Sequence, residues 1–199
     1  MHKVFVSYHH RNDQQYKEAL VGMATGHVFL DRSVHSGDID ERLPDQRIRR
    51  IIRDRHLRDS TVTVVLVGAE TARRKHVDWE IYSSMFDGTV NKRSGILAIS
   101  LPGTSSCWDV AHDGEKECIY PGFTEWISVT SRAEYEQRYP YMPARLIDNL
   151  VKPEARISVV PWDRVYNNPG NLAWLVEAAF RDRATCEYDL SRPMRRANS

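Results

Sequence analysis

The feature that most constrains the fold is a buried strand followed closely by a helix, between residues 61 and 85. Thr61–Val67 is a mostly β-branched apolar run, which is typical of a strand buried on both faces of a sheet. After a short polar connection, Val77, Ile81 and Met85 recur every four residues and predict one face of a helix. In an open α/β sheet, ligands bind beyond the carboxyl ends of the strands, where such strand-to-helix connections lie.

The same alternation of strands and helices continues through residues 3–101. Further strands are expected at Lys3–Tyr8, at Val28–Leu30 with Asp31, and at Gly95–Leu101. A helix through Gln14–Met23, capped by Asp13, and a second helix after Pro44 separate these strands. The pattern predicts an α/β fold, in which Lys3–Tyr8 and Thr61–Val67 are both central strands of a parallel sheet with helices on both faces.

The second half of the chain has a weaker pattern. Residues 102–155 read as an irregular insertion without a sustained period. A last strand is expected at Arg156–Val160, and a closing helix at Leu172–Arg183, capped near Asn168 or Asn171. We therefore expect a single domain over residues 1–185, followed by a flexible tail over residues 186–199.

Composition narrows the class of protein. The 199 residues carry 28 basic and 27 acidic side chains, and this balance argues against a dedicated binder of nucleic acid or of anionic membranes. No apolar run approaches the roughly 20 residues that a membrane span needs. The three cysteines, Cys107, Cys118 and Cys186, show no metal-binding spacing and indicate a reducing compartment. These features predict a soluble cytoplasmic protein without a metal site.

Glu80 follows Trp79 near the start of the helix that carries Val77 and Ile81. A carboxylate at a helix start is favoured by the helix dipole. From its position alone, we interpret Glu80 as a surface glutamate that stabilises the helix.

Five segments, in this order and spacing, resemble a TIR domain. They are VFVSY at 4–8, VFLD at 28–31, SGDIDERLP at 36–44, DSTVTVVLVG at 59–68 and VDWEI at 77–81. Within that superfamily, the VGAET element at 67–71 and an altered VYxW-like tail at 161–166 are similar to the ThsB-type proteins of the Thoeris anti-phage system. The resemblance implies a flavodoxin-like, TIR-like fold.

The resemblance also changes the interpretation of Glu80. Enzymatic TIR domains cleave the nicotinamide–ribose bond of NAD with one glutamate at this position, so Glu80 becomes the expected catalytic residue. Nicotinamide leaves as a neutral molecule, and the chemistry therefore needs no general acid. A carboxylate can instead stabilise the cation that develops on the ribose. NAD would then be the substrate, and no cofactor is implied.

Seven further residues are substrate-binding candidates under this resemblance, each with a structural alternative. They are Phe5, Ser7, Tyr8, His9, Arg11, Asp31 and Trp79. Family members contact NAD where the first three lie, and His9 or Arg11 would reach phosphate. The alternatives are that Phe5 is core, the His-His-Arg cluster solvated, Trp79 simply buried, and Asp31 the cap of the following loop. For Asp31 we favour the cap.

Three functions remain open at this point. An NAD glycohydrolase or ADP-ribosyl cyclase would make a cyclic ADP-ribose-type signal for a separate effector. A non-enzymatic TIR scaffold would act through self-association or a partner TIR domain, and a nucleoside-processing transferase is the weakest of the three. The polar loop Ser33–Glu41, which contains Gly37, is expected to be mobile and to order on NAD binding or on self-association.

Overall fold

The computed structural model describes residues 1–24, 26, 28–33, 44, 47, 50–89 and 91–198. Within these residues, five parallel strands form one sheet. The strands are β1 (His2–Ser7), β2 (Phe29–Asp31), β3 (Val62–Val67), β4 (Gly95–Ser100) and β5 (Ser158–Pro161). Their order, β2-β1-β3-β4-β5, is that of flavodoxin-like doubly wound folds. The predicted α/β fold is confirmed, and β1 and β3 both lie in the interior of the sheet.

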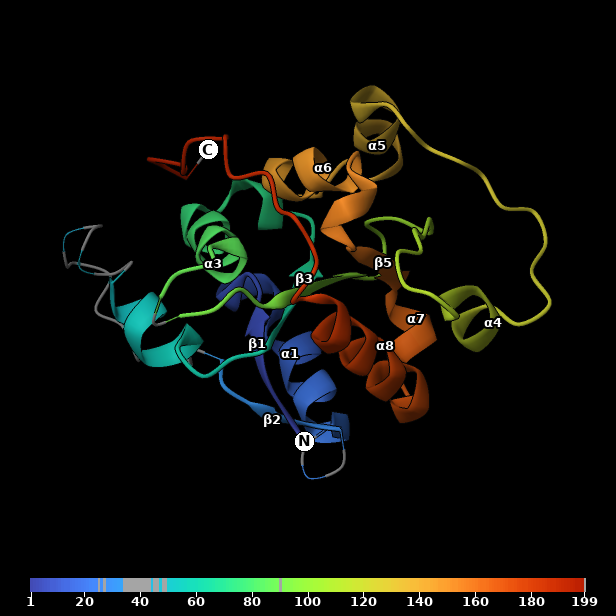
Figure 1. Cartoon of the computed structure of the whole chain (residues 1–199), viewed down its shortest axis with the longest axis horizontal. Helices are drawn as coiled ribbons and strands as arrows, with labels where there is room; N and C mark the ends of the chain where they lie inside the picture. The colour runs from blue at the N-terminus through green and yellow to red at the C-terminus, as the bar shows by residue number, and fades with distance from the viewer. Residues whose placement is uncertain are drawn as a thin grey trace.

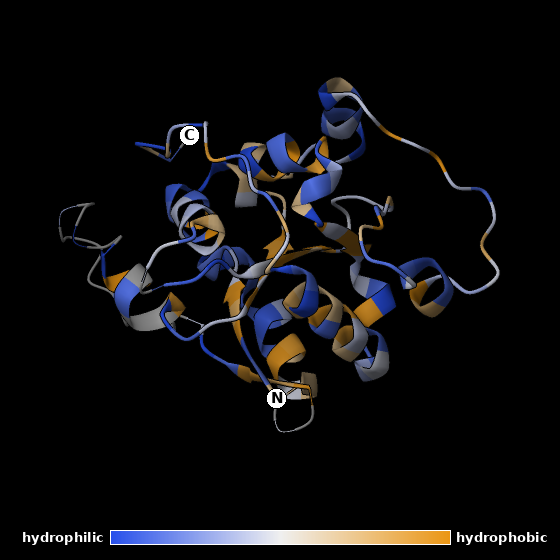
Figure 2. Ribbon diagram, in the orientation of Figure 1, coloured by the Kyte–Doolittle hydropathy of each residue, from blue (hydrophilic) through white to orange (hydrophobic). Residues whose placement is uncertain are grey.

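Helices cover both faces of the sheet (Figure 1). On one face lie α1 (His10–Ala24) and α8 (Pro169–Asp182), and on the other lie α3 (Lys75–Met85) and α6 (Ala144–Leu150). Alternate residues of β3 face opposite ways, so that Val64 and Leu66 pack toward α1 and α8 while Val65 and Val67 pack toward α3 and α6. Figure 2 shows the apolar residues concentrated along the strands between the two helical layers.

Residues 102–155 are more regular than predicted. They contain the short helices α4 (Glu115–Ile119) and α5 (Arg132–Arg138), then α6 and a 3₁₀ turn, η3 (Pro153–Ala155). A capping box starts α5, because Ser131 accepts a hydrogen bond from the Glu134 amide while the Glu134 side chain accepts one from the Ser131 amide. The description of this region as an irregular insertion is therefore wrong in part.

Two helix starts differ in their caps. The first helix begins at His10, so Asp13 lies inside its first turn and does not cap it. The closing helix begins at Pro169, and the Asn168 side chain accepts a hydrogen bond from the Asn171 amide. The prediction of a cap near Asn168 is thus confirmed. The four-residue helix α7 (Trp162–Val165) lies between β5 and α8.

The carboxyl-terminal tail also differs from the prediction. Residues 186–198 form no helix or strand, yet they make specific contacts along α6 and α3. For example, the Asp189 amide donates to Asn149 Oδ1 at 2.7 Å, and Tyr188 Oη donates to the Ser94 carbonyl at 3.0 Å. The expectation of a fraying tail does not hold for these residues.

Most of the loop Ser33–Glu41, including Gly37, lies outside the described residues, as does much of the helix expected after Pro44. The predictions about their mobility and charged face therefore stay predictions. After this gap the chain resumes in one turn of π-helix, η1 (Ile52–Leu57), which lies against α3. No helix in the described part of the chain is long and apolar enough to cross a membrane.

Candidate active site

Glu80 lies on α3 at the carboxyl end of β1. Ser7, the last residue of β1, donates a hydrogen bond from its hydroxyl to Glu80 Oε2 at 2.6 Å. Glu80 is only 5% exposed, and its neighbours Asp78, Trp79 and Ile81 are buried as well. The interpretation of Glu80 as a surface glutamate is therefore wrong.

Burial governs the charge of this carboxyl group. Removal from water raises the pKa of Glu80 to about 8, although the hydrogen bond from Ser7 lowers it in part. At neutral pH the resting protein consequently holds Glu80 mainly in its protonated, neutral form. A positive charge brought next to it would lower this pKa and favour the carboxylate.

Glu80→Gln is expected to make the protein more stable at alkaline pH. Between pH 4.5, the ordinary value, and about 8, the folded protein keeps a proton on Glu80 that the unfolded chain has lost. The free energy of unfolding therefore decreases as pH rises through this window. The variant lacks that dependence, and at pH 9 it should exceed the wild type by on the order of a few kcal/mol.

Urea unfolding of both proteins at pH 5 and pH 9 measures the difference. Glu117→Gln, at an exposed position on α4, is the control and should change little at either pH. Equal stability of wild type and Glu80→Gln at pH 9 would show that Glu80 is not held protonated by burial.

Two candidates, one in β1 and one directly after it, pack into the interior. Phe5 is fully buried in a cluster with Ile52, Leu57 and Trp79. Tyr8 is buried on the side of α1, and its hydroxyl donates to Gln14 Oε1 at 2.6 Å. Burial, and then the nearby Glu80 and Asp31, raise the pKa of Tyr8 to about 12. Phe5 is therefore a core residue in this structure, as the structural alternative expected.

His9 and Arg11 differ in their surroundings. Arg11 is exposed on α1. His9 is 8% exposed, and its Nδ1 has no hydrogen-bond partner in the described part of the chain. Burial, and then the Arg74 guanidinium, lower the pKa of His9. The ring is therefore neutral at pH 7 and offers a hydrogen bond, but no charge, to a ligand.

Asp31 is engaged in structural contacts. It accepts hydrogen bonds from Lys17 Nζ at 2.8 Å and from the Ser33 amide at 2.9 Å. Although burial opposes it, these bonds hold the pKa of Asp31 below its ordinary value. The favoured interpretation of Asp31 as a cap agrees with these contacts, and the Lys17 ion pair was not foreseen.

Three residues outside the candidate set hold the loops around the site. The Gly68 amide donates to Thr71 Oγ1 at 2.8 Å, and that hydroxyl lies 3.5 Å from Asp13 Oδ2. A Cβ added at Gly68 would lie 2.2 Å from Asp13 Oδ2, so no larger residue fits here without displacement. The VGxxT spacing thus joins the end of β3 to α1 and fixes the entry into α3.

A buried ion pair fixes α3 from its other side. Arg145 on α6 is fully buried and contacts Asp78 through two hydrogen bonds, Nε to Oδ1 at 2.9 Å and Nη2 to Oδ2 at 3.1 Å. Its partner precedes Glu80 by two residues, so the pair fixes the turn of α3 that carries the candidate carboxyl group. The sequence offered no signal for it, because the two residues are 67 positions apart.

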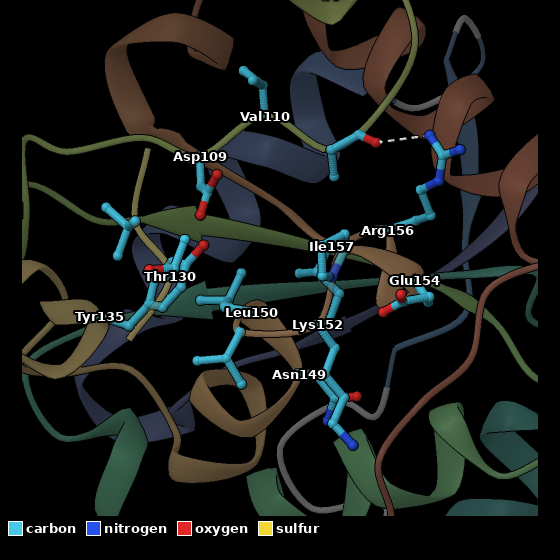
Figure 3. A pocket seen from close by; sticks show the side chains of 14 residues that line it. Asp109, Val110, Thr130, Tyr135, Asn149, Leu150, Lys152, Glu154, Arg156 and Ile157 are labelled. Atoms are coloured by element: carbon cyan, nitrogen blue, oxygen red, sulfur yellow. Dashed lines mark hydrogen bonds between the residues drawn. The ribbon is translucent and has the colours of Figure 1, made fainter. Parts of the chain in front are cut away.

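Two cavities lie at opposite ends of the strands, one at the amino ends and one at the carboxyl ends. One of about 420 Å³ is lined by residues that lead into the amino end of β5, including Leu150 and Lys152, and by Arg156, which donates to the Ala111 carbonyl at 3.1 Å (Figure 3). It is therefore on the edge away from Ser7 and Glu80. Another, of about 450 Å³, lies at the carboxyl ends of β4 and β5, the same edge as Ser7.

A doubly wound domain with a buried carboxyl group at the carboxyl ends of its central strands has the architecture expected of a TIR-like domain. Residues 5–106, just over half of the chain, match the TIR-like domain of the Thoeris protein ThsB, and the chain belongs to this family. No curated protein sequence matches the chain.

Proposed function

We propose that the protein is an NAD-consuming TIR enzyme that cleaves the nicotinamide–ribose bond at Glu80. The observation that carries the proposal is the Glu80 carboxyl group, buried on α3 and bonded to Ser7 at the carboxyl end of β1. By the resemblance of VDWEI at 77–81 to the tryptophan-then-glutamate segment of TIR domains, Glu80 corresponds to the glutamate that enzymatic members use for catalysis. A solitary carboxylate is also the group that this reaction needs.

The reaction follows from the charge on each group. The nicotinamide ring of NAD is cationic, and its approach favours the ionised form of Glu80. When the bond between the ribose carbon and the ring nitrogen breaks, its electron pair goes to nicotinamide, which leaves neutral. The positive charge develops on the ribose, where the carboxylate stabilises it. Ser7 keeps Oε2 oriented through its hydroxyl.

The acceptor decides the product. Water would attack the ribosyl cation, lose a proton and give ADP-ribose. An atom of the adenine or of the second ribose would instead attack the cation, and the group that attacked would lose a proton as the ring closes. The cavity at the carboxyl ends of β4 and β5 offers space for the rest of the dinucleotide. Trp108, Trp162 and Arg164 line it, and the buried Ser100 hydroxyl beside them has no partner in the described part of the chain. By family analogy, we propose a cyclic ADP-ribose-type signal that activates a separate effector in anti-phage defence, with self-association on activation.

Mass spectrometry of the purified protein incubated with NAD in ¹⁸O-labelled water tests the proposal. An NAD-consuming enzyme releases nicotinamide. Hydrolysis gives ADP-ribose that contains ¹⁸O. Cyclisation gives an unlabelled product that is lighter than unlabelled ADP-ribose by the mass of one water. Intact NAD after prolonged incubation, with or without the removal of residues 192–199 described below, would contradict an NAD-consuming activity.

A non-enzymatic TIR scaffold is the second candidate, and one observation favours it. In the described state Glu80 is 5% exposed and mainly protonated at neutral pH, which is unsuited to stabilising a cation. A scaffold would assemble with itself or with a partner TIR domain and leave NAD intact. The same incubation therefore separates the two functions.

A further inference from the structure

The last residues of the chain follow a defined path along α6 and α3 (Figure 1). Asn149 on α6 holds the start of this path, because its side chain bonds both the Asp189 amide and the Asp189 carbonyl, at 2.7 and 3.1 Å. Beyond it, residues 192–198, here called the strap, cross the amino-terminal part of α3. The strap therefore lies beside the turn of α3 that carries Glu80.

The buried Asp78–Arg145 pair fastens the strap. Arg145 donates to the carbonyl groups of Arg192 at 3.0 Å and Pro193 at 3.3 Å. Asp78 Oδ2 accepts a hydrogen bond from the Arg195 amide at 2.8 Å. Both charged groups of the pair thus also bond the strap backbone, so the strap adds hydrogen bonds to a buried ion pair.

Met194 anchors the strap in the apolar cluster beside the site. It packs against the cluster of Phe5, Ile52, Leu57 and Trp79, while Trp79 Nε1 donates to the Arg195 carbonyl at 2.9 Å. Trp79 is 2% exposed and directly precedes Glu80. Of the aromatic substrate-binding candidates, Phe5 and Trp79 therefore belong to the cluster that the strap covers, whereas Tyr8 lies on the other face of the sheet.

We propose that the strap is an autoinhibitory segment, which must leave Trp79 and Phe5 before NAD reaches Glu80. The inference rests on the proposed function, because it assigns this place to NAD. The strap contains no helix or strand. Its apolar anchor and its hydrogen bonds are made to α3, α6 and the residues beside them and not to strand backbone, so it can open without breaking the sheet. The apparent affinity for NAD is then the affinity of the open form multiplied by the fraction of molecules in which the strap is open. A mostly closed strap therefore weakens binding.

Met194→Gln in the full-length chain removes the apolar anchor at nearly constant size. NAD binding is measured by calorimetry with and without Met194→Gln, in the Glu80→Gln background, which slows turnover by on the order of 10²–10³. The dissociation constant is expected to decrease by on the order of tenfold, since a larger fraction of molecules is open. A chain that ends at Ser191 should bind at least as tightly. Arg196→Ala, at an exposed strap position, is the matched control and should leave binding unchanged.

Equal affinity with and without the anchor, or no NAD binding by either folded form, would overturn the strap proposal. Nicotinamide release is then compared in chains that retain Glu80. Tighter binding without any release would uphold the strap and refute the proposed catalytic function. Release at the same rate and the same KM from intact and strap-free chains would do the reverse.

Discussion

Glu80→Gln is expected to lower the rate of nicotinamide release from NAD by on the order of 10²–10³. The substitution keeps the size of the side chain and its ability to accept the Ser7 hydrogen bond, but it removes the charge that stabilises the ribosyl cation. Because a preorganised charge acts in a site protected from water, its loss affects the transition state far more than it affects NAD binding. The turnover number should therefore fall, with little change in affinity.

The chain provides a matched control in Glu115→Gln. Glu115 is also a fully buried glutamate whose pKa is raised by burial, and it accepts a hydrogen bond from the Ser158 hydroxyl at 2.5 Å. It lies at the start of α4, away from Ser7. The Glu115→Gln variant should keep its activity if Glu80 is needed because of where it lies and not merely because a buried glutamate has been replaced. A wild-type rate that survives Glu80→Gln would remove Glu80 from the catalytic role.

The two carboxylates that would be considered next already have partners. Asp78 is bonded to Arg145 and to the strap, and Asp31 is bonded to Lys17 and Ser33. Glu80, in contrast, bonds the uncharged Ser7 hydroxyl and belongs to neither ion pair. This difference in partners is the structural reason to assign the chemistry to Glu80.

Arg145→Ala is expected to destabilise the fold by about 3–5 kcal/mol, because it leaves the Asp78 carboxylate buried without its partner. Arg145 is fully buried, so water cannot replace it without rearrangement of α6 and the strap. The free energy of unfolding, measured by chemical denaturation, gives the cost directly. Arg192→Ala is the control, because Arg192 pairs with Asp148 at a half-exposed position and should cost about 1 kcal/mol or less.

If Arg145→Ala lowers the free energy of unfolding no more than Arg192→Ala does, the structural role assigned to the buried pair is wrong. It would mean that Asp78 becomes hydrated or protonated readily when its partner is removed. The strap would then lack the fixed attachment point that its contacts indicate.

The sheet was predictable because its strands are buried runs with a clear composition. Thr61–Val67 and Gly95–Leu101 contain mostly β-branched and apolar residues, and these two strands lie within one residue of their expected bounds. The last strand, expected at Arg156–Val160, begins two residues later. The short helices of residues 102–155 were not predictable in this way. A helix of five to seven residues, such as α4 or α6, spans at most two turns and shows no sustained period.

The location of Glu80 was predictable only in part. Its place on a helix after β3 follows from the periodicity of Val77, Ile81 and Met85, but its burial does not. Two further neighbours, η1 and the strap, lie against α3 in addition to α6 and the sheet face. A helix enclosed on so many sides buries polar positions that periodicity alone would place on the surface. The strap, more than a hundred residues away in sequence, leaves no local signal on α3.

The pH dependence of kcat/KM for nicotinamide release shows whether Glu80 must ionise before NAD is cleaved. NAD itself does not titrate near neutral pH. Burial lowers the pKa of His9, whereas burial raises that of Glu80, so the two groups move in opposite directions from their ordinary values. We expect kcat/KM to level off above about pH 8, the pKa of the buried carboxyl group, and to fall roughly tenfold per pH unit below it. An active enzyme whose kcat/KM stays constant from about pH 6 to pH 9 would show that cleavage of NAD does not depend on ionisation of Glu80.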